Sequence, residues 1–136
     1  MRAVLDPNVV ISGLISSEGA PARLLSGWRE GWFEVVVSPL LLEELRRALG
    51  YPKLRRRLSA ADAEAAMVWL AEGATRVEDA VMAPPVSSSD TGDDYLIALA
   101  AEQRAALVSG DRHLLDLKGR IPVYSPREFL GLVEDD

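Results

Sequence analysis

Short β-branched runs alternate with longer helical stretches along this chain, and this alternation restricts the fold more than any other sequence feature. Strand-like runs cover residues 3–5, 33–37, 106–108 and 121–124, with a weaker one at 74–77. Helical stretches are expected over 20–30, 39–49, 59–70, 93–103 and 126–132. Strands that are separated by helices form parallel βαβ units, so we predict an α/β fold with a central parallel sheet.

Ser-Pro pairs mark the starts of two of these helices. Ser38 precedes Pro39, and Ser125 precedes Pro126. A serine at the N-cap accepts a hydrogen bond from a free backbone amide, and proline at the first helical position loses no bond. Gly50 follows the first of these helices, which we therefore expect to end there.

Length and composition fit one soluble domain covering residues 1–136. Hydrophobic residues make up 49% of the chain, which is enough for a packed core. Cysteine is absent, which excludes disulfides, zinc–thiolate sites and thiol nucleophiles. Asp6 and Asn8 interrupt the apolar N-terminal segment, and no run approaches the ~20 apolar residues of a membrane span. We therefore predict a cytoplasmic protein without a membrane partner.

The charge of the chain is unevenly distributed. The net charge is −6, which weighs against a nucleic-acid partner because phosphate contacts come from Lys and Arg. Six basic residues nevertheless fall between Arg46 and Arg57. They form either a solvated surface or a contact with a polyanion, and the sequence leaves both readings open.

Acidic residues follow two of the predicted strands. Asp6 comes directly after the run 3–5, and Asp111 follows the run 106–108 and the pair Ser109-Gly110. In an open parallel sheet, ligands bind beyond the carboxyl ends of the strands, where the strand order reverses. We therefore expect both carboxylates to border one crevice.

Further acids lie on two predicted helices. Asp93 and Asp94 start one helix, where the helix dipole favours acidic residues without any function. Glu44 borders the apolar face of the helix 39–49, whereas Glu43 points nearly opposite because successive residues turn by about 100°. Glu44 is therefore the one of this pair that we expect to reach the crevice.

A cluster of these carboxylates would require a cation. Carboxylates that are brought together repel each other and are costly to desolvate. Oxygen ligands select hard ions such as Mg²⁺ or Mn²⁺, which orient phosphodiesters and activate water for hydrolysis. Sequence spacing alone does not show that the four acids meet, and that step depends on the fold.

Four segments of the chain resemble the PIN-domain family of nucleases, in particular the subgroup described as toxin components of toxin–antitoxin systems. The resemblance runs over essentially the whole chain, and the four segments occur in the family's order. They are residues 4–13 (VLDPNVVISG), 38–45 (SPLLLEEL), 93–100 (DDYLIALA) and 108–115 (VSGDRHLL). The resemblance implies a three-layer α/β/α sandwich with a parallel sheet in the order 3-2-1-4-5.

The resemblance also implies an activity and a set of site residues. By position, the four catalytic, metal-binding acids are Asp6, Glu44, Asp94 and Asp111. The residues expected to support them are Asn8, Ser109 and Asp93, and those expected to contact substrate are Arg112 and Arg46. The implied function is a Mg²⁺- or Mn²⁺-dependent endoribonuclease acting on single-stranded RNA, as a homodimer or higher oligomer with a possible antitoxin partner.

Two departures from the family pattern affect these expectations. Pro7 stands where the family usually has Thr or Ser, and His113 stands where many relatives have a further acid. Either change weakens metal binding or leaves one metal site instead of two. The tandem Asp93-Asp94 also leaves the third acid open by one residue, although the family register favours Asp94.

Two other functions fit parts of the sequence. One is a non-catalytic PIN-fold module that binds RNA or protein, which Pro7 and the negative net charge favour. The other is a phosphoaspartyl phosphatase or a receiver-like domain, because Asp6 follows the first strand. The phosphatase would need an acid where Asn8 stands, and neither protein class finds a clear match for its lysine.

Overall fold

A computed structural model describes residues 1–134 of the chain and contains a five-stranded parallel sheet. The strands are β1 (Arg2–Leu5), β2 (Glu34–Val37), β3 (Thr75–Arg76), β4 (Ala106–Val108) and β5 (Val123–Tyr124). Their order is β3-β2-β1-β4-β5, and each neighbouring pair is parallel. The predicted α/β fold and strand order are confirmed. Receiver domains have a different order, 2-1-3-4-5, so the fold disfavours that alternative.

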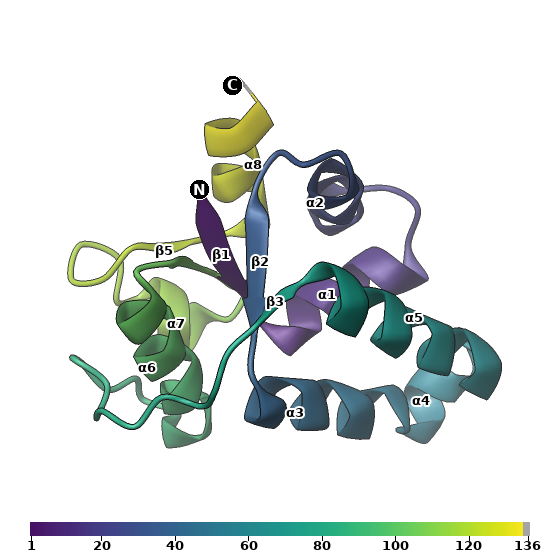
Figure 1. The fold of residues 1–136 in the computed structure, drawn as a ribbon, viewed down its shortest axis with the longest axis horizontal. Coiled ribbons are helices and arrows are strands. Elements are labelled where there is room, and N and C mark those ends of the chain that lie inside the picture. Colours follow the sequence, from purple (N-terminus) through teal and green to yellow (C-terminus); the bar gives the residue numbers. More distant parts are fainter. Residues whose placement is uncertain (135–136) are drawn as a thin grey trace.

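Helices connect the strands and lie to both sides of β1 and β2 (Figure 1). They are α1 (Pro7–Ile15), α2 (Ala20–Arg29), α3 (Pro39–Leu49), α4 (Pro52–Arg55), α5 (Ala60–Gly73), α6 (Asp94–Gln103), α7 (Arg112–Leu115) and α8 (Pro126–Glu134). A 3₁₀ turn, η1 (Thr91–Asp93), precedes α6. The five helices expected from the sequence are present, whereas α1, α4 and α7 were not expected. Helix α8 ends at residue 134, and residues 135–136 lie outside the described part of the chain.

Side-chain caps start the helices at the carboxyl edge of the sheet. The Ser38 hydroxyl accepts a hydrogen bond from the Leu41 amide at 3.4 Å, as the Ser-Pro pattern predicted. Asp6 and Asp111 cap α1 and α7 in the same manner. Because a cap satisfies backbone amides that lack partners inside the helix, local hydrogen bonding holds each of these side chains in place.

The core lies on both faces of the sheet. Residues 3–5 of β1 and 35–37 of β2 are at most 1% exposed. Central strands of a parallel sheet are covered on both sides, which explains why they are continuously apolar and do not alternate. None of the described helices combines the length and the apolarity that crossing a membrane requires.

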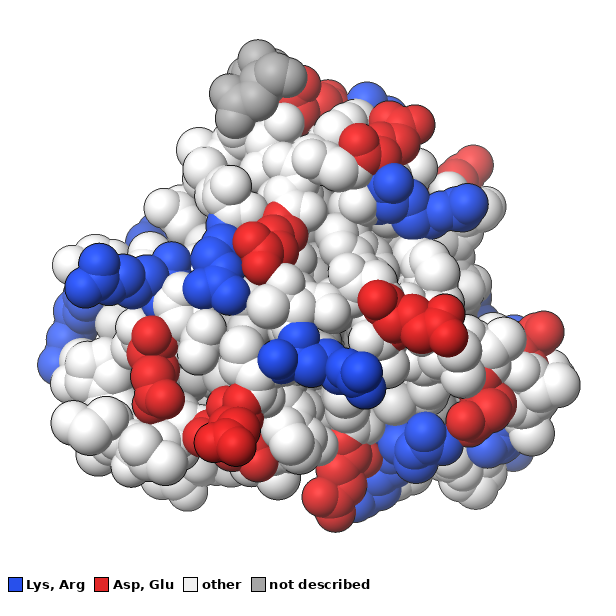
Figure 2. Space-filling model, viewed as in Figure 1, with Lys and Arg blue, Asp and Glu red and all other residues white. Residues whose placement is uncertain are grey.

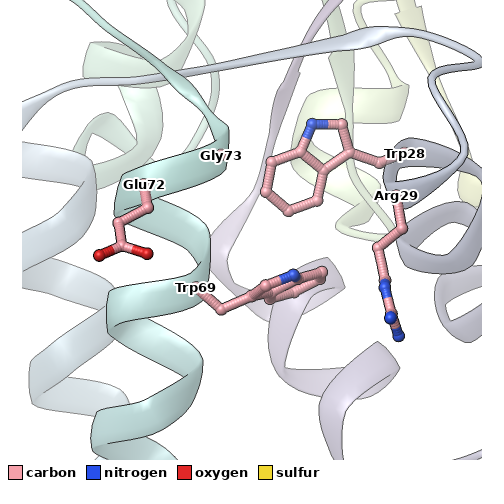
Figure 3. A pocket seen from close by; sticks show the side chains of 5 residues that line it. All are labelled: Trp28, Arg29, Trp69, Glu72 and Gly73. Atoms are coloured by element: carbon pink, nitrogen blue, oxygen red, sulfur yellow. The ribbon is translucent and has the colours of Figure 1, made fainter.

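A pair of tryptophans packs between α2 and α5. Trp28 of α2 and Trp69 of α5 pack edge to face, with ring centroids 4.8 Å apart. They line a pocket of about 430 Å³ that Arg29 and Glu72 border (Figure 3). Leu24, Leu25 and Trp28 of α2 are buried in the core.

Candidate functional site

Asp6 is the most buried acid of the described chain and stands at the end of β1. Asp6 is 4% exposed, and both oxygens of its carboxylate accept hydrogen bonds. Oδ1 accepts from the Asn8 amide at 3.0 Å, and Oδ2 accepts from the Ser109 hydroxyl at 2.7 Å. Burial raises the pKa of Asp6, repulsion from Asp111 and Glu44 raises it further, and the two hydrogen bonds oppose the rise.

Ser109 links the ends of β1 and β4. Its fully buried hydroxyl donates to Asp6 and accepts from the Asp111 amide at 2.9 Å. The β1–β4 pairing brings these residues together, because Leu5 lies opposite Val108 in the register. The strand order reverses between β1 and β4. Asp6 and Asp111 therefore lie at the carboxyl edge beside this reversal, where parallel sheets bind ligands.

A pocket opens beside this edge. It measures about 340 Å³, and its lining residues are Asn8, Val9, Ser12, Pro21, Gly110, Asp111 and Pro126. Asp111 is half-buried and lines this pocket, with Oδ1 accepting from the His113 amide at 2.8 Å. The carboxylate is thus held by its own helix start while it borders open space.

Glu44 reaches the same cluster from α3. It is half-buried, and its charge contributes to the raised pKa of Asp6. The Tyr95 hydroxyl of α6 donates a hydrogen bond to Glu44 Oε2. Burial and this bond to a carboxylate raise the pKa of Tyr95, so the phenol stays protonated as a donor. Glu43 is exposed and pairs with Arg47, as the helical geometry predicted.

The adjacent acids Asp93 and Asp94 have different surroundings. Burial raises the pKa of Asp93 to about 6, and repulsion from Asp6, Asp111 and Glu44 adds to the rise. Asp94 Oδ1 instead accepts a hydrogen bond from the Ser88 amide at 2.9 Å. The assignment of Asp94 as the third acid stays a prediction. Asp94 uses one oxygen for the Ser88 amide, whereas Asp93 is the one of the pair whose pKa is raised by the charges of Asp6, Asp111 and Glu44.

The acids at this edge repel one another. The charges of Asp111 and Glu44 raise the pKa of Asp6, and those of Asp6, Asp111 and Glu44 raise the pKa of Asp93. Oxygen ligands of this kind are those that hard cations such as Mg²⁺ prefer. Among residues 1–134, however, no group of three or more Asp, Glu or His side chains is arranged so that it could hold a metal ion.

Comparison with known protein families gives a match over most of the chain. A sequence profile described as PIN domain matches residues 2–113. The chain belongs to the PIN domain family. Members of this family are generally nucleases.

Solved structures and a curated relative extend the comparison of this PIN domain. PAE2754 from Pyrobaculum aerophilum has a TM-score of 0.66 at 17% identity, covering 100% of this chain and 91% of its own. VapBC2 from Rickettsia felis, crystallised with a DNA fragment from their promoter, has a TM-score of 0.61 at 12% identity, with coverages of 92% and 98%. The uncharacterized protein MJ1680 from Methanocaldococcus jannaschii is 27% identical over 143 residues, spanning 96% of this chain and 90% of MJ1680. The structural likenesses support the fold.

Other predicted residues of the PIN domain lie around the acids without entering the cluster. Asn8 is exposed and contributes its backbone amide to Asp6. Arg112 is exposed at the first position of α7, and Arg46 pairs with Glu64 at 2.7 Å. Their proposed contacts with substrate stay predictions.

The two residues that depart from the family pattern have structural roles of their own. Pro7 is buried at the first position of α1, where its ring suits the helix start. His113 is exposed, and its Nδ1 shares a hydrogen bond with the Ser89 hydroxyl. Neither side chain adds a carboxylate or hydroxyl to the acid cluster.

Tyr95 is the site residue that sequence reasoning did not identify. It stands directly after the two acids at the start of α6, and its contact with Glu44 spans 51 positions of sequence. A tyrosine at a helix start has no distinctive pattern, and its only sequence signal is its position next to the acid pair.

Proposed function

We propose that this PIN domain is a metal-dependent endoribonuclease that hydrolyses phosphodiester bonds in single-stranded RNA. The observation that carries the proposal is the buried carboxylate of Asp6 at the carboxyl edge of β1 and β4, where the charges of Asp111 and Glu44 raise its pKa and its own charge raises that of Asp93. A cluster of negative charge is costly to keep unless it binds a cation, and the family supplies the reaction class.

Each residue has a distinct part in this proposal. Asp6, Asp93 and Asp111 would hold the cation, while the Ser109 hydroxyl links the first and last of them by donating to Asp6 and accepting from the Asp111 amide. Glu44, fixed by Tyr95, orients the attacking water or accepts its proton. Mg²⁺ or Mn²⁺, when bound, would orient the phosphodiester and lower the pKa of the attacking water.

Neighbouring residues provide matched controls for a cleavage assay. Labelled single-stranded RNA is incubated with Mn²⁺ and purified variants, and fragments are resolved on denaturing gels. We expect Asp6→Asn and Glu44→Gln to lose about 100-fold or more in rate, in the range seen when catalytic groups are removed. Glu43→Gln should retain the wild-type rate within about threefold, because Glu43 is exposed and faces away from the cluster.

The same assay decides the third acid. Asp93→Asn should abolish cleavage while Asp94→Asn retains most of it, because Asp94 is bonded to the Ser88 amide. The reverse result would return the role to Asp94, as the family register predicts. Cleavage that continues in EDTA, or equal losses in the Glu43 and Glu44 variants, would contradict the proposed function.

Metal titration and trapping separate the two alternatives. Calorimetry with Mn²⁺ should show binding that Asp6→Asn removes, whereas a non-catalytic PIN module would bind the ion poorly in both forms. A phosphoaspartyl enzyme would instead be trapped by beryllium fluoride on Asp6, with no RNA cleavage.

We also propose that the chain acts as the toxin of a toxin–antitoxin pair and forms homodimers. The family resemblance of the sequence supports this proposal. Two neighbouring apolar side chains also support it: Val81 and Met82 are 86% and 71% exposed, and exposed apolar patches often mark surfaces that bind other proteins. Light scattering tests the dimer. Rescue of growth by the protein encoded beside this chain, when both are produced together, tests the antitoxin.

A further inference from the structure

A basic corner of the molecule lies where α3 runs into α4. Lys53, Arg55 and Arg56 are exposed and make no ion pair with any residue in 1–134. Tyr51 precedes them and is 54% exposed. We call these four residues the α4 patch. Figure 2 shows basic side chains over this corner, with acidic ones interleaved toward α3 and α5.

The helical turn distributes the patch around the exposed sides of α4. The Arg55 amide bonds to the Tyr51 carbonyl at 3.1 Å, so these two residues lie on the same side of the turn. Leu54 and Leu58 pack against the core. At about 100° per residue, Arg56 and Lys53 lie about 140° and about 200° around the helix from Tyr51, so they extend the positive charge to the other exposed sides of α4. An outward tyrosine beside unpaired cations combines a stacking platform with charges for a polyanion.

Two connections hold the patch in a set relation to the acid cluster. Helix α3 carries Glu44 and leads into α4, and it has 11 residues, a length of about 16 Å. The Arg57 guanidinium donates to the Ile15 carbonyl at 3.3 Å, which ties the end of α4 to the end of α1. Helix α1 begins at Asp6, so both helices run from the acids toward α4 (Figure 1).

We propose that the α4 patch binds the backbone of the RNA strand a few nucleotides from the bond that is cut, with Tyr51 stacking on a base. This inference rests on the proposed function and adds a substrate-binding surface to it. A single extended polyanion accounts for both features, because it spans the distance from the acids to the patch. It also explains how a chain of net charge −6 holds RNA: the cations that meet the strand are concentrated in one place.

Binding is measured separately from cleavage. Fluorescence anisotropy follows a labelled 12-nucleotide single-stranded RNA on the Asp6→Asn protein in EDTA, between 50 and 250 mM NaCl. We expect the triple variant Lys53→Ser, Arg55→Ser, Arg56→Ser to raise Kd about tenfold and to reduce the salt slope by about 2, since each single-strand phosphate contact contributes about 0.7. Tyr51→Ala should raise Kd about tenfold, and Tyr51→Phe should not.

A second triple variant controls for net charge. Arg104, Arg120 and Arg127 are exposed, lie outside α3 and α4, and form no ion pair among the described residues. Their replacement by Ser changes the total charge equally and should leave the salt slope of RNA binding within about 0.5 of the parent. Equal losses in both triple variants would overturn the proposal, as would a parent that binds no RNA. Thermal unfolding confirms that each variant is folded.

Three further outcomes keep this inference distinct from the proposed function. If RNA binds through the patch but is never cleaved with Mn²⁺, the nuclease proposal fails and the patch remains. If a polyglutamate peptide binds through the patch and RNA does not, the patch serves an acidic protein and this inference fails. If the patch triple variant of the otherwise wild-type enzyme keeps the parent kcat/KM, the inference fails while the nuclease stands.

Discussion

Replacing Asp93 with Asn should stabilise the metal-free protein at neutral pH. The pKa of Asp93 is raised from 3.8 to about 6, with burial as the largest cause and repulsion from Asp6 as the next. The folded state therefore holds a proton that the unfolded chain releases between these two values. Stability falls as pH rises from about 4 to about 6 and stays reduced above that, because ionising the folded protein is disfavoured. Asparagine carries no charge at any of these pH values, so the variant does not undergo this loss of stability as pH rises.

The size of the effect follows from the shift. A change from 3.8 to about 6 corresponds to about 3 kcal/mol at 1.36 kcal/mol per unit. Because Asp93 is only partly buried, solvent screening lowers this to about 1–2 kcal/mol. For a chain of this length, the expected rise in Tm at pH 7.5 is about 3–8 °C.

Thermal unfolding followed by circular dichroism in EDTA measures this difference at pH 4 and pH 7.5. The two proteins should unfold at similar temperatures near pH 4 and diverge at pH 7.5. Asp94→Asn is the matched control: it removes the same charge one residue away while keeping an oxygen for the Ser88 amide. If Asp94→Asn stabilises as much as Asp93→Asn, or if neither does, the electrostatic account of the cluster is wrong.

Four further outcomes follow from the structure. Tyr95→Phe should lower the cleavage rate about tenfold with little change in Tm, because Glu44 loses the donor that orients it; an unchanged rate would remove Tyr95 from the site. Mn²⁺ at 100 times its Kd should raise stability at pH 7.5 by about 2.7 kcal/mol, and chelation should reverse the gain. Gly27→Ala should cost about 1–3 kcal/mol in denaturant unfolding, since a methyl group there overlaps the Trp32 ring. Gly131→Ala in α8 meets open space and should be neutral or stabilising by up to about 1 kcal/mol.

The elements predicted from sequence are those whose local signals agree. Ser38-Pro39 predicts the start of α3 because the N-cap serine and the apolar periodicity of the following residues indicate the same helix start. The same kind of signal stands at Asp6-Pro7, yet α1 was not predicted. The segment that follows is rich in Val and Ile and contains a glycine, which lowers its helix propensity, and packing against α2 and α3 outweighs that preference.

The sequence predicted which strand ends carry acids of the candidate site. It did not predict the direction in which the acids on the helices point. Asp6 and Asp111 follow central strands, and any parallel sheet brings such ends together. The choice between Asp93 and Asp94 depends on the 3₁₀ turn that precedes α6, which sets the angle at which each carboxylate leaves the backbone. Hydrogen bonds within residues 88–94 accompany that turn: the Ser88 amide donates to Asp94, and the Ser88 hydroxyl donates to the Asp90 carbonyl. Helical periodicity in the sequence does not predict these bonds.

The sheet order has a consequence for the timing of activity during synthesis. Strand β1 pairs with β4, whose residues are made about a hundred positions later, and Asp111 follows β4. A nascent chain that ends before this point has β1 with one edge unpaired and its first acid without the serine that holds it. The acids at this edge therefore cannot assemble until residues 106–111 have left the ribosome. The order of the strands would thereby delay the proposed nuclease activity until that point of synthesis.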